Sequence, residues 1–474
     1  MSDNKEEAHP NAKFTTGSTM RHVITMTTTG SIGLVAIFLV DALNLFYISL
    51  LGQDALAAAI GYAGTLMFFT TSIAIGMTIA VGAMVSKALG EEDRVRAAEN
   101  GGAALLLIAL AMGIVTALMW PNIGYLLSLL GAKGATLEIA TGFLEIVLPS
   151  IPIMAIGMGA SGILRGVGDA KRAMYVTLIG GAASAVLDPL FIFGFDLEVT
   201  GAAIATVISR FLIMAVGLHG AIYVHHLVKV PSRATFASIA RPFSVIAIPA
   251  VLTQLATPVG NAYVTAQISN FGDDAVAGWA VIGRLIPVAF GVIFALSGAV
   301  GPILGQNYGA KRFDRINEAM RDALIFTMVY VIGTCILLAL MAGTIADIFG
   351  AQNEARELIV FFCRFAAISF LFNGGLFVAN AAFNNLGFAF YSTVFNWGRS
   401  TLGVIPFVWV GAHFYGAQGV IAGWGLGAVV FGIAAVITCF RVIKNIETQG
   451  GGGSDHGTAP PSAHSPFTSA KGAI

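Results

Sequence analysis

Long apolar stretches dominate the chain, and polar residues gather in the short segments between them. A helix needs about 20 apolar residues to cross a hydrocarbon core of about 30 Å. Barrel strands would instead alternate apolar and polar positions, which these stretches do not do. The pattern therefore predicts an all-α membrane protein with twelve transmembrane helices. The predicted spans are 27–50, 57–86, 101–121, 136–158, 173–195, 200–226, 243–268, 275–300, 322–345, 357–382, 391–412 and 417–440.

Positive charges lie mainly in the loops that follow the even-numbered spans. The loops after spans 2, 4, 6 and 8 contain 13 lysines and arginines, whereas the opposite loops contain two, Lys133 and Arg356. Cytoplasmic loops of membrane proteins carry the excess of Lys and Arg. We therefore expect a multi-pass protein of a bacterial-type inner membrane with both termini in the cytoplasm.

The two halves of the chain repeat each other. The stretch "SLLGQDALAA" at 49–58 is similar to "SNFGDDAVAG" at 269–278, and "MVSKALGEEDRVRAAE" is similar to "ILGQNYGAKRFDRINE". Gly90 with Gly309 keeps an offset of 219 residues, and two further glycine pairs keep the same offset. Because this offset contains six spans, an even number, the halves should share one orientation and be related by an axis along the membrane normal.

The repeat divides the chain into five predicted parts. They are a cytoplasmic N-terminal segment (1–26), an N-lobe of six helices (27–226), a cytoplasmic linker (227–242), a C-lobe of six helices (243–441) and a disordered cytoplasmic tail (442–474). The tail is predicted to be disordered because its Gly-, Ser- and Pro-rich composition buries too little apolar surface. Two bundles of this kind suit a carrier that works by alternating access at their interface.

The overall composition excludes several classes of function. Hydrophobic residues make up 57% of the chain and charged residues 11%, against about 25% charged residues in soluble proteins. The formal net charge is zero and no basic stretch alternates with aromatic residues, so no nucleic-acid partner is expected. The histidines are scattered, and no G-x-x-x-x-G-K-[ST] phosphate loop occurs. We therefore expect neither an enzyme nor an ATP-driven pump, and no cofactor.

Two acidic residues lie inside predicted spans of the first half. Asp41 is near the middle of the first span, where an ionised carboxylate costs about 2.5–3.5 kcal/mol. Asp188 directly precedes Pro189, which leaves the carbonyl of Ala185 without its helical hydrogen bond. Carboxylates with a free carbonyl and nearby hydroxyls can hold a proton or coordinate a dehydrated cation. The predicted cation-coupling residues are Asp41, Asp188, Ser184 and Thr206.

Structural roles are the alternative for both acids. Asp41 could pair with Asn44 or Tyr47, and Asp188 could pair with Arg210. In the second half, Asn261 takes the position of Asp41 and carries no charge. This difference indicates that coupling resides in one lobe only.

Candidate substrate contacts come from both halves. Methionine and aromatic side chains suit varied hydrophobic ligands and bind cations through the ring faces, although such residues at helical spacing more often serve packing. Two arginines inside predicted spans, Arg284 and Arg399, could tune the electric field of a cleft or extend to the membrane interface. The predicted cleft residues are Asn44, Tyr47, Met67, Phe68, Gln254, Asn261, Arg284 and Asn373.

Three motifs resemble those of the multidrug and toxic compound extrusion (MATE) transporters. They are "LGQNYGAKRFDR" after the eighth span, "LRGVGDAKRAMY" after the fourth, and "VLDPLFIFGF....TGAAIAT" at 186–206. The resemblance implies two six-helix lobes, a central cleft, and export of amphiphilic, often cationic compounds against an inward flow of H+ or Na+. It also implies that Asp41 and Asp188 match the functional acids of the family in helices 1 and 5, and that Thr206 matches a family hydroxyl.

The chain differs from the NorM-like branch of that family, which depends on acids in helices 7 and 10. Those positions fall near Thr257 and Asn373, and neither is acidic. The chain therefore resembles the DNA-damage-inducible F branch. Ser184 stands where relatives often have Asn, which weakens a sodium site.

These features together predict a secondary active multidrug efflux transporter. We expect it to export small amphiphilic drugs or organic cations in exchange for H+, to contact membrane lipid and to act as a monomer. One alternative is a Na+-coupled drug antiporter, with the ion at Asp41 and Asp188. The other is a lipid-linked substrate flippase of the same superfamily.

Overall fold

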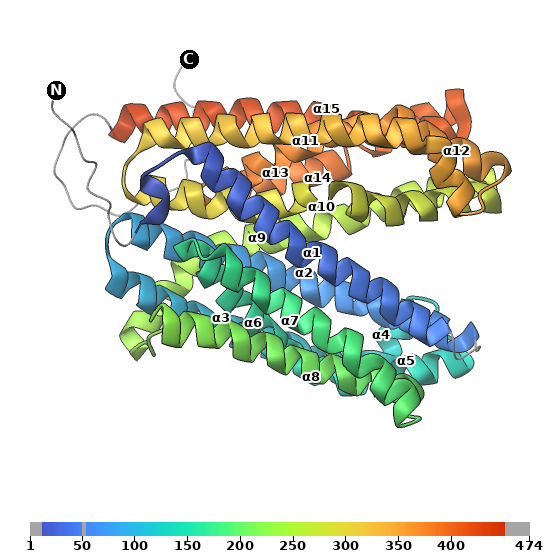
Figure 1. The fold of residues 1–474 in the computed structure, drawn as a ribbon, viewed down its shortest axis with the longest axis horizontal. Helices are drawn as coiled ribbons and strands as arrows, with labels where there is room; N and C mark the ends of the chain where they lie inside the picture. The colour runs from blue at the N-terminus through green and yellow to red at the C-terminus, as the bar shows by residue number, and fades with distance from the viewer. Residues whose placement is uncertain (1–11, 50–53, 451–474) are drawn as a thin grey trace, which may run out of the picture.

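The computed structural model consists of helices in two groups, α1–α8 and α9–α15 (Figure 1). It describes residues 12–49 and 54–450. The side chains of 41–46, 48–49, 54–55, 57 and 450, and the part of the predicted tail from residue 451, lie outside the described residues.

The helices of the first group correspond to the first six predicted spans. They are α1 (Thr19–Ser49), α2 (Asp54–Gly90), α3 (Arg94–Met119), α4 (Ile123–Leu129), α5 (Gly134–Val147), α6 (Ile151–Val167), α7 (Ala170–Pro189) and α8 (Glu198–Leu218). The second group repeats this pattern. It contains α9 (Arg233–Ile268), α10 (Asp273–Gly309), α11 (Phe313–Ile348), α12 (Asn353–Arg364), α13 (Phe370–Asn385), α14 (Ala389–Ser400) and α15 (Ile405–Gly450).

Eleven stretches of the described residues are long and apolar enough to span a membrane, and the last, Ala389–Gln449, has 61 residues. This stretch contains a turn at Tyr415 and Gly416, whose φ/ψ angles are not helical. Gly411 and Gly419, four residues to either side of Tyr415, face each other, because a Cβ on Gly411 would lie 2.0 Å from the carbonyl oxygen of Gly419. The stretch is therefore an antiparallel hairpin that crosses twice, which accounts for the twelve predicted spans.

Two predicted boundaries differ from the structure outside the membrane. Helix α9 begins at Arg233, inside the predicted linker 227–242, because Ser232 caps it with its side chain. Helix α15 continues to Gly450, past the predicted start of the tail, because Ile443 still packs in a buried apolar cluster. Hydropathy marks the membrane-spanning part of a helix and not its extension beyond the membrane.

The backbone repeats along with the sequence. Glu92 and Lys311, which are 219 residues apart, have left-handed φ angles of 61° and 56°. Side chains disfavour this conformation, so its recurrence at equivalent positions shows that the two halves make the same turns. Three further equivalent pairs have positive φ angles, namely Gly131 with Gly350, Gly134 with Asn353, and Gly168 with Gly387.

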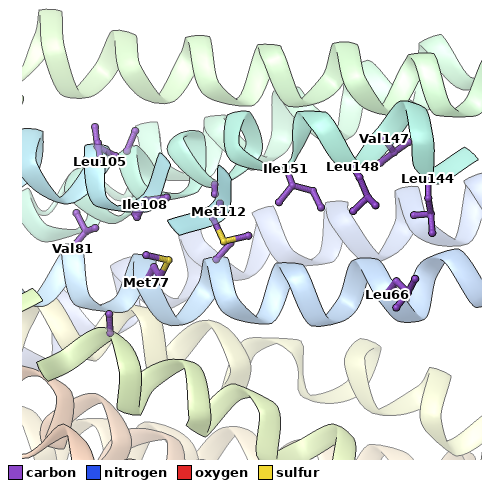
Figure 2. Close-up of a cluster of buried hydrophobic side chains, with 14 of the residues drawn as sticks. Leu66, Met77, Val81, Leu105, Ile108, Met112, Leu144, Val147, Leu148 and Ile151 are labelled. Carbon is purple, nitrogen blue, oxygen red and sulfur yellow. The ribbon is translucent and has the colours of Figure 1, made fainter. Parts of the chain in front are cut away.

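Most buried apolar residues of each group pack against other residues of that group. In the first group, Leu66 and Met77 of α2 lie in the same buried cluster as Ile108 of α3 (Figure 2). In the second group, Phe290 and Phe362 belong to a separate cluster. The first cluster also includes Phe243 and Ala247 of α9, so the two groups share part of their buried apolar surface.

The two groups meet at the end of the molecule where the described termini lie, which we call the closed end (Figure 1). A Cβ on Gly90 of α2 would lie 2.0 Å from the carbonyl oxygen of Gln306, and a Cβ on Gly309 of α10 would lie 2.1 Å from that of Lys87. Gln306 and Gly309 are the repeat equivalents of Lys87 and Gly90. Such reciprocal contacts are the mark of a two-fold axis, and they confirm the pseudo-symmetric pair of bundles.

At the opposite end, which we call the open end, the two groups separate (Figure 1). Towards the closed end, α2 has no exposed side chain after Phe69. Helix α10 has none after Val288, which is the repeat equivalent of Phe69. Beyond these two residues both helices are covered as far as Gly90 and Gly309. The halves of α2 and α10 towards the open end thus carry exposed side chains in the region where the two groups separate (Figure 1).

The N-terminal residues 12–17 connect the two groups at the closed end. The side chain of Phe14 is 1% exposed, and its backbone N–H donates to Oε1 of Gln306 at 2.9 Å. On the other side, Nζ of Lys13 donates to the carbonyl of Gly168 at 2.9 Å. Part of the predicted N-terminal segment is therefore ordered by contacts with both groups.

Candidate cation-coupling and substrate site

Helices α1 and α7 pack side by side, and two contacts define one section of their interface. A Cβ on Gly181 of α7 would lie 3.3 Å from Cγ2 of Val40 on α1. Further towards the open end, the ring of Tyr47 on α1 meets that of Phe193, with 6.3 Å between their centroids. The section between these two contacts, residues 40–47 of α1 and 181–193 of α7 and the turn that follows it, forms a layer roughly 10 Å deep along α1.

That layer contains both predicted acids. The backbone of Asp41 lies in α1, but its side chain and that of Asn44 are outside the described residues. Asp188 of α7 is 1% exposed. Pro189 ends α7, and the wider π-helical turn Leu190–Gly194 follows. The missing N–H of proline disrupts the α-helical pattern, as the sequence predicts, and π-turns are frequent at functional sites.

The two predicted hydroxyl ligands lie on α7 and α8, which pack against each other. Oγ of Ser184, one turn before Asp188, donates to Oγ of Ser209 at 2.9 Å. Oγ1 of Thr206 donates to the carbonyl of Ala202 at 2.9 Å. Each hydroxyl proton therefore has an acceptor, while the oxygen lone pairs can still accept a hydrogen bond or bind a cation.

Arg210, the alternative partner of Asp188, makes its hydrogen bonds elsewhere. Its Nη1 donates to the carbonyl of Val147 and to Oγ of Ser150, both at 2.9 Å. These acceptors lie at the junction of α5 and α6. The buried guanidinium thus holds α8 against that junction.

The predicted cleft residues of α2 and α10 differ in their surroundings. Phe68 is 53% exposed on the half of α2 towards the open end. Arg284 is exposed on the corresponding part of α10. Met67 is half-buried against the core of the first group, so its contacts are those of a packing residue.

One predicted cleft residue of the second group, Asn373, contacts an arginine whose neighbours the sequence did not reveal. Arg399 of α14 donates from Nη1 to Oδ1 of Asn373 at 3.5 Å and from Nη2 to Oγ1 of Thr257 at 3.0 Å. Gln254 is half-buried and Asn261 is exposed, both on α9. The sequence signal for Arg399 is its charge, which lies eleven positions into an apolar stretch.

A charged cluster outside the membrane follows the left-handed turn at Gly168. Asp169 accepts hydrogen bonds from the backbone N–H and the guanidinium of Arg172 and lies 2.8 Å from Nε2 of His225. Burial opposes ionisation of Asp169, but the hydrogen bonds from His225 and Arg172 outweigh it and lower the pKa of this carboxyl below its ordinary value. The motif "LRGVGDAKRAMY" thus encodes a helix end, a turn and the cap of α7.

No group of three or more His, Cys, Asp or Glu residues that could hold a metal ion occurs in the described part of the chain. The sequence profile of the MatE family matches residues 31–190 and 249–410, one stretch in each group of helices. The chain belongs to the MatE family. Members of this family are transporters and not enzymes, so this MatE protein is a multi-pass membrane transporter.

Relatives of this MatE protein are named for different substrates. It is 27% identical over 437 residues to the "FAD transporter" of Shewanella oneidensis, which covers 90% of this chain and 96% of the relative. It is 26% identical over 394 residues to the "Multidrug export protein MepA" of Staphylococcus haemolyticus, which covers 81% of this chain and 84% of the relative. Each match includes both groups of helices.

Solved structures share the fold. The MATE transporter VcmN of Vibrio cholerae, in a mutant form, superposes with a TM-score of 0.86 at 23% identity, over 90% of this chain and 97% of that one. A structure described as the outward-facing conformation of a multidrug resistance MATE family transporter also has a TM-score of 0.86, at 21% identity, over 94% of this chain and 100% of that one. The all-helical, two-lobed fold predicted from the sequence is confirmed.

Proposed function

We propose that this MatE protein is a secondary active efflux transporter that exchanges small amphiphilic compounds for H+ through the acids of α1 and α7. The observation that carries the proposal is the position of Asp188. It is a fully buried carboxyl group at membrane depth, in the same layer as Asp41 and directly before a π-helical turn. Acids inside the membrane mark ion or proton pathways, and irregular backbone beside them can rearrange.

The closed end faces the cytoplasm in this proposal. The loops with most of the lysines and arginines follow α2, α6 and α10 at this end, including Lys87 beside Gly309, as expected for cytoplasmic loops. The open end then admits protons from outside to Asp41 and Asp188. Their protonation removes charge from the α1–α7 interface, α1 rearranges, and the cleft releases its substrate outward.

Energy for export comes from the proton gradient. One charge that crosses a membrane potential of 100 mV provides about 2.3 kcal/mol. For an uncharged compound this amount sustains a substrate ratio of about 50-fold, because each 1.4 kcal/mol is a factor of ten. Exchange of one proton for a monovalent cation moves no net charge, so the pH gradient alone drives it. One proton per substrate is therefore enough for useful export. The proposed transporter acts as a monomer in a bacterial-type inner membrane.

Sodium is the alternative ion. The same layer offers carboxylate and hydroxyl oxygens from Asp41, Asp188, Ser184 and Thr206, and hard cations prefer oxygen ligands. Ser184 provides one hydroxyl where an Asn would add an amide carbonyl. The proton is preferred because it needs only a carboxylate and a hydrogen-bonding partner.

The test uses reconstituted vesicles with an imposed pH gradient or Na+ gradient and ethidium as the transported dye. Asp188→Asn and Asp41→Asn should each reduce pH-driven transport at least about tenfold, because an amide cannot take up the coupling proton. The matched control is Asp196→Asn, an exposed acid in the loop after α7, which should transport normally. Transport driven by Na+ alone would overturn proton coupling, and full pH-driven activity in Asp188→Asn would overturn the assigned site.

A second class of substrate is favoured by one observation. A relative is named an FAD transporter, and FAD carries negatively charged phosphates. The described part of the C-terminal group contains the buried Arg399 and the exposed Arg284 at membrane depth. Amphiphiles with an anionic group are therefore proposed as substrates beside organic cations, while lipid-linked substrates remain the third candidate.

A further inference from the structure

The C-terminal group contains a buried arginine to which the described residues supply no acid. Arg399 is 6% exposed, and its two hydrogen-bond acceptors, Asn373 and Thr257, are uncharged. Its Nε is buried without a hydrogen-bond partner. An isolated charge in a membrane-spanning bundle is costly unless a charged or strongly polar group compensates it. The positive charge of Arg399 therefore calls for a negatively charged partner from outside the described residues.

Hydroxyl groups on the same helices are also unsatisfied. Thr253 lies one turn before Thr257 on α9. Ser369 lies one turn before Asn373 and directly precedes α13. Ser400 follows Arg399 in α14. All three hydroxyls are buried without a hydrogen-bond partner, whereas buried polar groups nearly always have one. Ser369 packs beside Gly425 and Ser400 packs beside Gly260, so the free donor that can meet a polar ligand is the guanidinium of Arg399.

We call Arg399 and its two acceptors, Thr257 and Asn373, the polar site. Thr257, which accepts from Arg399, is exposed. On the same helix, Val245, Leu252 and Val259 form an exposed apolar stripe at seven-residue spacing, which marks the lipid-facing side. At 3.6 residues per turn, Thr257 lies roughly 140° around the helix from that stripe. Its exposed surface therefore faces the protein interior and not the lipid.

A second arginine lies on the half of α10 towards the open end. Arg284 is exposed about 16 Å along α10 from Asp273, near the middle of a membrane. It lies about three turns before Ala295 on the same helix face, and Ala295 is the residue that a Cβ on Gly30 of α1 would meet at 3.7 Å. The side of α10 towards α1 thus carries a positive charge. The acidic residues of the C-terminal group that the structure describes lie towards the ends of their helices.

We propose that the C-terminal group binds the anionic group of a transported amphiphile, a carboxylate or a phosphate, at Arg399. Nε and the remaining Nη protons of the guanidinium form a planar set of donors that matches two oxygens of such a group. Arg284 attracts the anion into the cleft. This inference rests on the proposed efflux function and adds the residue that binds the anionic head group.

Riboflavin and FMN are suitable probes, because they share one fluorescent ring system and differ by a phosphate group. The full-length protein is purified in a maltoside detergent, which contains no phosphate, and binding is measured by quenching of flavin fluorescence. Wild-type protein should bind FMN at least about tenfold more tightly than riboflavin. Arg399→Gln should weaken FMN binding by about 10- to 100-fold, the usual effect of removing a charged hydrogen bond, and change riboflavin binding less than about twofold.

Two variants control for indirect effects. Arg399→Lys keeps the charge and should retain part of the preference for FMN, which a purely structural role would not explain. Arg364→Gln removes an exposed arginine at the end of α12 and should leave both affinities unchanged. Arg284→Gln should slow FMN association and reduce its dependence on salt, because a charge at the cleft wall acts mainly on encounter.

Several results would overturn the proposal. Equal affinities for FMN and riboflavin in wild-type protein would do so, as would an equal loss of both in Arg399→Gln. If Arg399→Gln fails to fold, the wild-type protein decides: sodium phosphate should displace FMN, whereas sodium chloride of equal ionic strength should not. Displacement of FMN by added phosphatidylglycerol would reassign the site to a lipid head group. Because binding in detergent needs no gradient, these results are independent of the coupling ion and of the test on Asp188.

Discussion

Substitution of the two glycines that touch across the closed end should shift the transporter towards the opposite conformation. Gly90 and Gly309 meet the backbones of Gln306 and Lys87, and an added Cβ would lie 2.0 or 2.1 Å from a carbonyl oxygen. Ordinary contact begins at 3.4 Å, so the helices must separate by more than 1 Å. This strain exists only while the closed end is closed.

The size of the shift follows from the cost of overpacking, which is typically about 1–3 kcal/mol. If that cost falls on the closed-end state alone, Gly90→Ala shifts the equilibrium about 5- to 150-fold. Gly309→Ala should have the same effect, because its contact is the repeat equivalent. Matched controls on the same helices are Gly64→Ala and Gly283→Ala, where an added Cβ meets nothing within 4 Å.

Labelling of a single cysteine measures the shift. Ser86 is fully buried at the closed end, so a Ser86→Cys background lacking the native cysteines should react slowly with a membrane-impermeant thiol reagent applied to that side. Reaction should accelerate at least about fivefold in Gly90→Ala and Gly309→Ala and stay unchanged in the two controls. Unchanged labelling in both test variants, or equal acceleration in the controls, would refute the reasoning.

Three further variants test other parts of the structure. Phe14→Ala removes a buried ring between the groups, a change that costs about 3–5 kcal/mol in a packed core; it should increase proteolysis of residues 12–17, and unchanged cleavage would contradict the bridging role. The lowered pKa of Asp169 means that its ionised form stabilises the fold above a pH of about 4 and that this stability is lost as the pH falls further. Thermal unfolding should therefore lose more stability between about pH 6 and about pH 3 in wild-type protein than in Asp169→Asn, and parallel curves would exclude this contribution. Pro189→Ala restores a backbone N–H and should slow ethidium exchange while dye binding is kept, whereas normal exchange would show that the π-turn is not needed.

Hydropathy and the internal repeat were sufficient to predict the fold, because span length and turn glycines are local properties of the sequence. The repeat even placed the residues of the two-fold contact, Gly90 and Gly309, at one offset. Boundaries outside the membrane were predicted less well. The order of Phe14 depends on Gln306, almost 300 positions away, and no local pattern reports such a contact.

The candidate site was predictable only where one residue was conspicuous by itself. Asp188 stood out as an acid before a proline inside an apolar span, and the structure places it in a buried layer beside a π-turn. Thr257 and Asn373 were noted because they lack the acids of another branch. The structure shows that Arg399 donates hydrogen bonds to these same two positions, which are 142 and 26 residues away in the chain, so the sequence could not indicate that they share a neighbour.

The symmetry of the backbone and the asymmetry of the charges together constrain the coupling mechanism. The proposed proton acceptor Asp188 belongs to the N-terminal group, whereas the proposed anion site at Arg399 belongs to the C-terminal group. A proton and an anionic substrate would then occupy different groups and would not compete for one residue. Exchange must in that case be transmitted by movement of the groups relative to each other, and the close contact of Gly90 and Gly309 must open in that movement. If so, Gly90→Ala should alter the transport of cationic and anionic compounds alike, whereas Arg399→Gln should alter only the latter.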